Sequence, residues 1–465
     1  MKVSKDKYCI IAAFIASFAF FALAYPYHLI RREQMTLFLY DLPYIFRTYS
    51  GSGCLARFSG DFAEQFYCYR ILGPLVVSLL LTLAGVLTYK ICRTFAGKNI
   101  SFLIAFIVYC LSFLRETDTR YITQYTISSV GYLLCIYAAL RFRKPLHKFC
   151  ALPVALVLGW FLFGSPYQKD YGKLIGKPDF EYEKLIAMDV ETYRENWDKV
   201  LDISKSNLLY NEACYLHNLA TAMKGKLSDK LLSHPQNHAN GLFLMVNDVT
   251  PFSNSMAGEV WYHLGNMTLA DQSAMVSLQF SPKHTGARYI QRLAMINLIS
   301  EQYGSAEKYL KMLSKTLLYR KWALSMMPCN QSAGTVSNLA DMRRNLVTSD
   351  IVSSSNDYRL LLRQLLEANP DNARAREYLL CYDLLTCNLD AFMNDFTPGE
   401  ENSNIYQEAT LIWLNIQYNK GAFTDVDFYS YGITDNTIER FRKFNRSPER
   451  LRNTYWYYYT NAIDE

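Results

Sequence analysis

Five apolar segments lie within the first 165 residues, and their lengths restrict the fold more than any other feature of the sequence. A helix rises about 1.5 Å per residue and needs about 20 apolar residues to cross a hydrocarbon core of about 30 Å. The five segments are 8–24, 72–89, 100–114, 121–140 and 149–164, of which the third and fifth are short. We therefore expect residues 1–165 to form a bundle of about five transmembrane helices, with the lipid bilayer as its partner.

The first apolar segment has two interpretations. It follows a basic N-terminus and ends on Ala22-Leu23-Ala24, which matches the small-residue pattern of a signal-peptidase site. It is also just long enough to span a bilayer. We favour an uncleaved anchor, because the later apolar segments keep the chain in the membrane in either case.

Basic residues gather in the membrane half and predict its orientation. Residues 1–165 hold 17 Lys and Arg against 7 Asp and Glu, whereas the remainder holds 31 against 35. Short basic stretches precede the first segment (2–7), follow the second (90–98) and precede the fifth (141–148). With five spans, all three fall on one side, which the positive-inside rule makes the cytoplasm. The C-terminal half then lies outside, which in a bacterium is the periplasm. Its slight acidity argues against nucleic acid as a partner.

The predicted first external loop, residues 26–70, is unusually long. Residues 29–49 mix apolar side chains with charges, as an interfacial amphipathic helix does, and Pro43 is expected to kink or break that helix. Cys54 and Cys68 both lie in this loop, and the sequence leaves open whether they form a disulfide.

The acidic residues of this loop are the candidate catalytic residues. Membrane glycosyltransferases that use lipid-phosphate donors place carboxylates in their first external loop, and Asp41, Asp61 and Glu64 could take that role here. The alternative, which we favour, places Asp61 and Glu64 in the first turn of a helix, where carboxylates complement the helix dipole. No DxD or paired-carboxylate motif stands in this loop, and no HExxH, CxxC or glycine-rich phosphate motif is present in the chain. Asp61 and Glu64 therefore remain only a weak catalytic alternative, and we predict no cofactor and no metal site.

Residues 166–465 show helical periodicity with little strand-like alternation. The stretch 287–318 partly matches the 34-residue tetratricopeptide pattern, with Ala306 at its small-residue position, and a second unit begins at Asn369-Pro370. Weaker units occur at 180–204 and 211–232, and the aromatic run 453–459 is expected to form a capping helix. These patterns predict an all-α chain in which a tetratricopeptide-like α-solenoid follows the transmembrane bundle.

Several short motifs resemble those of DUF6057, a family of uncharacterised polytopic membrane proteins from Bacteroidetes. The motifs are EQ…LFL at 33–39, GDFAEQFY at 60–67, LG at 72–73, NWDKV at 196–200, LSDKL at 227–231, AEKYL at 306–310 and TYWYYY at 454–459. The resemblance spans most of the chain. It implies a bacterial inner-membrane protein with a helical-repeat C-terminal half, and it supplies no catalytic residues.

Two hypotheses for function follow from these observations. The first is a membrane-anchored scaffold whose helical repeats bind an envelope protein at the periplasmic face. The second is a membrane enzyme that acts on a lipid-linked sugar through Asp61 or Glu64. A transporter ranks third, because no ionisable residue lies in the middle of a predicted span.

Overall fold

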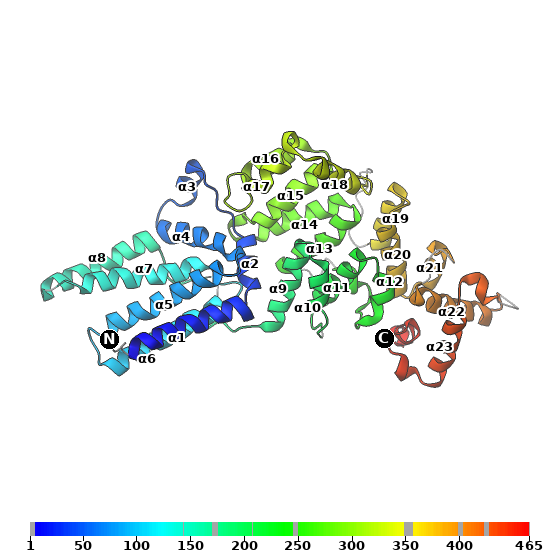
Figure 1. Ribbon diagram of the computed structural model, residues 1–465, viewed down its shortest axis with the longest axis horizontal. Coiled ribbons are helices and arrows are strands. Elements are labelled where there is room, and N and C mark those ends of the chain that lie inside the picture. Colours follow the sequence, from blue (N-terminus) through cyan, green and yellow to red (C-terminus); the bar gives the residue numbers. More distant parts are fainter. Residues whose placement is uncertain are drawn as a thin grey trace. The chain divides into compact units, whose positions relative to one another are not determined.

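The computed structural model describes residues 5–142, 144–169, 175–206, 208–244, 250–347, 357–398, 403–422 and 427–464 (Figure 1). These residues form 24 α-helices joined by turns and short 3-10 segments, and they contain no β-strand. The all-α fold class predicted from the sequence is confirmed. The chain divides into two compact units: unit 1 comprises Met1–Ile186, Leu278–Ala294 and Tyr303–Ser332, and unit 2 comprises Ala187–Ser277, Met295–Gln302 and Ala333–Glu465.

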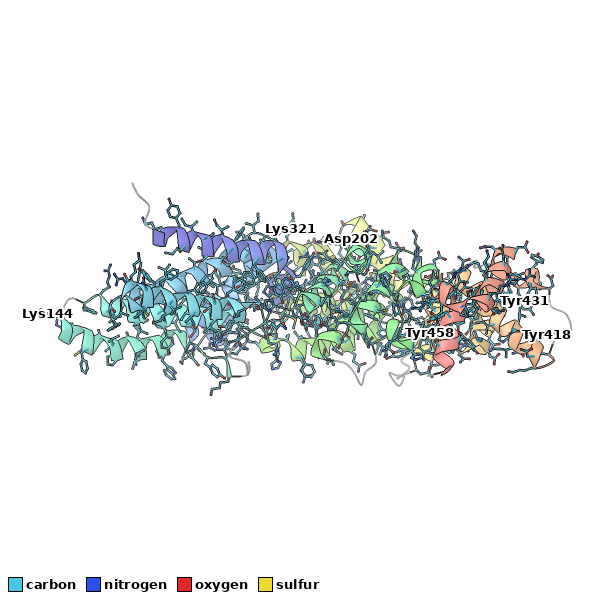
Figure 2. The ribbon with its side chains drawn as sticks, turned by 90° about the horizontal axis from the view of Figure 1, so that it is seen from below. Lys144, Asp202, Lys321, Tyr418, Tyr431 and Tyr458 are labelled. Atoms are coloured by element: carbon cyan, nitrogen blue, oxygen red, sulfur yellow. The ribbon has the colours of Figure 1, made fainter. Side chains whose placement is uncertain are left out.

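Long apolar helices form one end of unit 1, where they lie side by side (Figure 1). They are α1 (Lys5–Ala19) with its π-helical extension η1 (Phe20–Ala24), α5 (Leu72–Cys92), α6 (Lys98–Glu116), α7 (Thr123–Leu140) and α8 (Pro145–Phe163). Helix α5 packs against α1, α6 and α7, and α7 packs against α8. Lys144 lies at the end of the α7–α8 hairpin (Figure 2). The α5–α6 and α7–α8 turns therefore lie at one end of the bundle, and the α6–α7 turn lies at the other.

Three helical segments, rather than the five expected, are both long and apolar enough to cross a membrane within the described residues. They are Lys7–Ala24, Leu72–Cys92 and Lys98–Glu116. Helix α7 has the length, but its first two turns carry Thr123, Gln124, Thr126, Ser128 and Ser129, which lower its hydropathy. In α8 the apolar part is limited to Phe149–Phe163. The expectation of five spans is corrected to three, with α7 and α8 as a further helical hairpin.

The loop between α1 and α5 is folded into unit 1. It contains α2 (Tyr27–Gln34), α3 (Leu42–Thr48), α4 (Cys54–Glu64) and the 3-10 turn η2 (Gln65–Cys68). The single interfacial helix predicted for residues 29–49 is wrong. Helix α2 is buried along its length from His28 to Gln34 and ends before an extended stretch, and Pro43 lies in the first turn of α3. Proline suits that position because the first helical N–H groups have no partner within the helix.

Two glycines let α4 pack closely on α7 and α8. A Cβ atom at Gly60 would lie 2.9 Å from the Cβ of Gln124, and one at Gly53 would lie 3.1 Å from the Cα of Gly164. Gly53 also has a φ of +74°, a left-handed conformation that glycine adopts without strain. Its N–H donates to the carbonyl of Phe161 at 2.9 Å. The start of α4 is thus fixed against the end of α8.

The remaining described parts of unit 1 come from the second half of the chain. They include the 3-10 turn η7 (Pro282–His284), the first part of α15 (Ala287–Ile299), α16 (Tyr303–Leu313) and α17 (Arg320–Met326). The sequence predicted a membrane part at 1–165 and a soluble part at 166–465, and that division stays a prediction. The compact units do not follow a single cut, because residues 278–294 and 303–332 fold with the N-terminal helices.

Unit 2 consists of short helices connected mostly by tight turns. Three of its helices, α9, α14 and α15, are shared with unit 1. The helices of unit 2 are α9 (Phe180–Tyr193), α10 (Trp197–Ile203), α11 (Asn211–Met223), α12 (Leu227–Lys230), α13 (Pro251–Leu264), α14 (Met267–Phe280), α15 (Ala287–Ile299), α18 (Ala333–Arg343), α19 (Tyr358–Ala368), α20 (Ala373–Leu385), α21 (Leu389–Asp395), α22 (Asn404–Asn419), α23 (Asp435–Arg446) and α24 (Tyr455–Asp464).

Four helix pairs share the same connecting turn. The pairs α9–α10, α11–α12, α15–α16 and α20–α21 are each joined by three residues, and the middle residue has a positive φ: 59° at Glu195, 66° at Gly225, 59° at Glu301 and 56° at Cys387. In each turn the third residue donates its N–H to the carbonyl five residues earlier, as in a Schellman C-cap. The four segments predicted as repeat units therefore all form helix hairpins. A tetratricopeptide-like solenoid remains a proposal.

The predicted terminal helix forms and packs on α22. Trp456 joins a buried cluster with Leu411, Leu414 and Phe444. Its indole N–H donates to the carbonyl of Glu408 at 3.0 Å. On the same helix, the hydroxyl of Tyr458 (Figure 2) donates to the carbonyl of Leu385 at 2.7 Å. The aromatic run at the C-terminus is thus part of the core of unit 2.

Candidate functional site

Polar and charged side chains concentrate at the end of the unit 1 bundle opposite Lys144. They come from the loop 26–70, from the end of α6 and the start of α7, and from residues 278–332. We call this group the loop cluster and define it by Arg32, Glu33, Asp41, Asp61, Glu64, Glu116, Lys283, Lys315 and Tyr319. Because it includes the acidic residues singled out in the sequence, it is the candidate functional site of this chain.

A buried ion pair joins α2 to the end of α6. The Arg32 Nη1 atom lies 2.6 Å from Glu116 Oε2, and the two side chains are 7% and 0% exposed. Arg32 also donates to the carbonyl of Asp118 at 2.8 Å and to that of Glu116 at 3.1 Å. The second carboxylate oxygen of Glu116 accepts a short hydrogen bond from Thr126. The negative charge of Glu116 offsets the burial of Arg32, and the pKa of the guanidinium is raised.

Glu183 from α9 caps the start of α2. Its carboxylate accepts the backbone N–H groups of Tyr27 at 2.6 Å and of His28 at 3.1 Å. Burial raises the pKa of Glu183 to about 8, although these two hydrogen bonds act in the opposite direction. The imidazole of His28 lies 3.8 Å away and is fully buried, which lowers its pKa, as does the nearby positive charge of Arg32. His28 is therefore neutral at physiological pH.

Asp61 binds Lys283, a residue far along the chain. Both of its carboxylate oxygens lie 2.6 Å from the Nζ of Lys283, and Tyr49 donates its hydroxyl to one of them at 2.9 Å. The Asp61 side chain is 3% exposed, whereas Lys283 is 34% exposed. Burial and the adjacent Asp61 charge raise the pKa of the Tyr49 phenol, so Tyr49 remains a donor.

Glu64 lies one turn further along α4 and is also buried. It accepts a hydrogen bond from the hydroxyl of Thr36 at 2.7 Å. Burial raises the pKa of Glu64, and the neighbouring charge of Asp61 raises it further. A cavity of about 10 Å³ lies beside Thr36 and is lined also by Glu33, Gln65 and Tyr319. That volume is enough for about one water molecule.

The expected position of these two carboxylates in a first helical turn is wrong. Helix α4 runs from Cys54 to Glu64, so Asp61 and Glu64 lie in its last turn. At that end the helix dipole disfavours negative charge. Lys283 supplies the compensation for Asp61, and it lies 222 residues away in the sequence.

The remaining acidic residues of the loop contact the same later segment. Lys315 Nζ lies 3.2 Å from Asp41 Oδ1, and the N–H of Tyr40 donates to the carbonyl of Lys315 at 2.7 Å. Tyr319 donates its hydroxyl to Glu33 at 2.8 Å. Asp41, Asp61 and Glu33 thus each bind a residue between 283 and 319, so the loop serves as the docking surface for that segment within unit 1.

The chemistry available to the loop cluster follows from these contacts. Asp61 is paired with a cation, and Glu64 has the raised pKa that a general acid would need. The cavity beside Thr36, the hydrogen-bond partner of Glu64, has room for about one water molecule. Among the described residues, no three His, Cys, Asp or Glu side chains lie close enough to hold a metal ion. Cys54 and Cys68 are recorded as thiols rather than as a disulfide.

Sequence reasoning missed the Arg32–Glu116 pair and the partners of the loop carboxylates. Glu116 is fully buried, and nothing local in the sequence shows it. In unit 2 the rings of His217 and His234 lie 4.4 Å apart, although the residues are 17 positions apart in the sequence. Burial lowers the pKa of His217 to about 4, so it is a neutral core residue, and it is hydrogen-bonded to Ser204 at 2.8 Å.

Comparison with known proteins gives one match. No curated protein and no solved structure matches the chain. The sequence model of DUF6057, described as a family of unknown function, matches residues 3–169 and 166–462, which together cover nearly the whole chain. The chain therefore belongs to the DUF6057 family.

Proposed function

We propose that this protein is a membrane-anchored helical scaffold that binds a protein partner at the periplasmic face of a bacterial inner membrane. The observation that carries the proposal is the use of the loop carboxylates: Asp41, Asp61 and Glu33 each hold residues of the chain's own later segment. A loop that docks helices of the second half onto the membrane bundle is a structural joint. It holds residues 283–319 against the membrane bundle within unit 1.

The bundle supports the membrane anchor. Few of the residues in α1 and α6 are buried within the chain, as expected for helices whose outward surfaces face lipid. With three spans, as with five, the last span ends on the side of the membrane opposite the N-terminus. The basic residues at 2–7 and 90–98, on the same side of three spans, favour a cytoplasmic N-terminus; the loop cluster and the later helices would then lie in the periplasm.

The repeated turns support the binding role. Four hairpins with the same three-residue turn are typical of helical-repeat proteins, in which each pair buries one face on the next. Stacked tetratricopeptide-like pairs form an extended surface for peptides and folded partners. Exposed aromatic and aliphatic side chains such as Leu209 (64% exposed) and Tyr429 (66% exposed) occur on unit 2 and suit such contacts.

A photo-crosslinking experiment in native membranes tests the proposal. A photoreactive residue is placed at Leu209 or Tyr429 of the full-length protein, and at the exposed position Val157 on α8 as a matched control. We expect one or a few discrete protein adducts from unit 2 and lipid adducts from Val157. Repeated absence of protein adducts from several exposed unit 2 positions would contradict the scaffold.

The alternative function is a polytopic glycosyltransferase-like enzyme that uses a lipid-linked sugar donor. One observation favours it: the raised pKa of buried Glu64 is the property of a general acid. The contacts of Asp61 and the water-sized cavity beside Thr36 favour the scaffold. Replacing Asp61 and Glu64 and comparing the envelope glycans of the cells distinguishes the two.

A further inference from the structure

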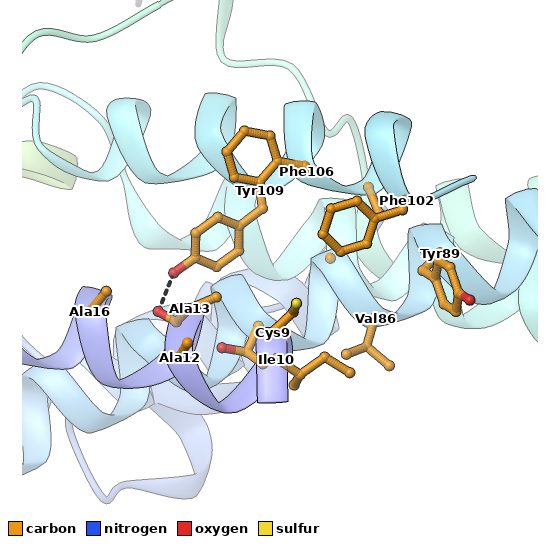
Figure 3. A pocket seen from close by; sticks show the side chains of 13 residues that line it. Cys9, Ile10, Ala12, Ala13, Ala16, Val86, Tyr89, Phe102, Phe106 and Tyr109 are labelled. Carbon is orange, nitrogen blue, oxygen red and sulfur yellow. Dashed lines mark hydrogen bonds between the residues drawn. The ribbon is translucent and has the colours of Figure 1, made fainter. Parts of the chain in front are cut away.

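A partly open cavity of about 460 Å³ lies between α1, α5 and α6 (Figure 3). Its walls include several small residues, Ala12, Ala13, Ala16, Gly85 and Ala105, which leave space that larger side chains would fill. Tyr109 crosses from α6 to α1 and donates its hydroxyl to the carbonyl of Ala13 at 2.7 Å (Figure 3). We call this cavity the bundle groove.

The bundle groove suits an apolar occupant. Two of the hydroxyl groups that line it are already bonded within the protein: that of Tyr109 to Ala13, and that of Thr82 to the carbonyl of Ser78 at 2.7 Å. Apolar cavities of this kind do not retain water. The volume of about 460 Å³ greatly exceeds the roughly 10–15 Å³ that one water molecule needs on the same measure, so the groove has room for a stretch of acyl chain.

The fit of an acyl chain does not by itself favour one lipid over another, because hydrocarbon surrounds the groove on the membrane side. Selection has to come from the headgroup. One helical turn beyond the lining residues, each of the three helices carries a basic residue. Lys7 precedes Ile10 by three positions, Arg93 follows Tyr89 by four, and Lys98 precedes Phe102 by four.

Residues three or four apart share one face of a helix, so these bases extend the faces that line the groove. They also lie at one end of the bundle, because α1 begins, α5 ends and α6 begins there. The charge at this end complements a phosphate group, and the positive-inside orientation places it at the cytoplasmic headgroup level, where anionic lipids attract basic residues.

We propose that the bundle groove binds an anionic phospholipid, with one acyl chain between α1, α5 and α6 and the phosphate near Lys7, Arg93 and Lys98. The inference rests on the proposed membrane location of the bundle. A neutral lipid brings no net negative charge to these three basic residues, and a second copy of this chain would bring the same positive charges to them. Both are outcomes of the test.

Native mass spectrometry of the full-length, detergent-extracted protein tests the proposal. The protein is titrated with phosphatidylglycerol and with phosphatidylcholine of the same acyl chains. We expect the affinity for phosphatidylglycerol to exceed that for phosphatidylcholine. Changing Arg93→Gln and Lys98→Gln should lower it by about fivefold per residue, the factor that corresponds to about 1 kcal/mol for each basic residue near an anionic lipid surface. Lys144→Gln, at the α7–α8 end, is the charge control (Figure 2).

A second variant tests the groove itself. Ala12 lines the groove and is exposed to it, so Ala12→Phe should fill the space and reduce binding of both lipids, whereas Val157→Phe on the outer face of α8 should not. Equal affinity for the two lipids, unchanged binding by Ala12→Phe, or a dimer that Ala12→Phe disrupts would each overturn the proposal. If the protein is found in the membrane fraction and one of these results is obtained, only the lipid site is refuted. If the protein is found in the soluble fraction of the cells, the membrane anchor itself is refuted.

Discussion

The buried Arg32–Glu116 pair gives the sharpest prediction about stability. Replacing Arg32 by Met leaves the Glu116 carboxylate fully buried without its cation. At the observed 2.6 Å and an effective dielectric constant of about 20, the lost Coulomb attraction is roughly 6 kcal/mol. Part of that attraction only repays the desolvation of the two ions. Removing one partner of a buried pair therefore costs roughly 3–5 kcal/mol.

A double-mutant cycle isolates the free energy of the Arg32–Glu116 interaction from the other effects of each replacement. Arg32→Met combined with Glu116→Leu removes both charges, so it should recover part of the loss, although Thr126 and the carbonyl of Asp118 lose their partners. We expect a coupling free energy of roughly 2–3 kcal/mol in the double-mutant cycle. The exposed pair Glu307–Lys311 on α16 is the control, with an expected coupling of about 0.3–0.5 kcal/mol.

Unfolding of the purified protein, followed by tryptophan fluorescence in detergent, is the assay. A loss of 3–5 kcal/mol corresponds to a fall in Tm of roughly 6–20 °C, at about 2–4 °C per kcal/mol for a domain of 150–250 residues. The reasoning fails if Arg32→Met lowers the Tm no more than a change at Lys311, or if the two single effects simply add.

Three further predictions concern other parts of the fold. Between pH of about 4.5 and 8, Glu183 binds more protons in the folded state than in the unfolded state, so its contribution to stability falls as the pH rises through that window. Glu183→Gln should therefore flatten the pH dependence of the Tm measured by thermal unfolding, and should raise the Tm at pH 8 relative to the parent. Gly60→Ala should cost about 1–3 kcal/mol because its Cβ would contact Gln124, whereas Gly304→Ala, in open space on α16, should stabilise by about 0.4–1 kcal/mol in the same denaturant titration. Trp456→Ala should cost about 3–5 kcal/mol and increase amide hydrogen exchange in α22–α24, and unchanged exchange there would contradict the packing of the terminal helix.

Helix periodicity was sufficient to locate most elements of the second half of the chain. The repeat at 287–318 contains α15 and α16, with Ala306, Leu310 and Leu313 fully buried as its frame requires. The prediction succeeds because the buried residues of a helix recur every three to four positions, whatever the helix packs against. Apolar run length located the bundle helices for the same reason, since that signal is local.

The loop 26–70 could not be predicted from local signals. Its charges resembled those of an interfacial helix, yet Arg32 is buried because Glu116, 84 positions later, compensates for it. Asp61 was predicted to lie in the first turn of a helix, yet it lies in the last turn of α4, where Lys283 balances its charge. Both errors have one cause: the energy of a buried charge depends on a partner that only the tertiary fold supplies.

The account's central claim is that the loop carboxylates hold the chain together rather than perform chemistry. The double variant Asp61→Asn/Lys283→Met tests it most directly, because it removes the carboxylate and its cation together and so leaves no unpaired buried charge. The measurement is the envelope-glycan profile of cells whose only copy of the gene carries this variant, at matched protein level and with the Tm of the purified protein as the check on folding. The account predicts glycans identical to those of the parent strain. Loss or change of a glycan while the variant remains folded would show that Asp61 acts chemically and would contradict it.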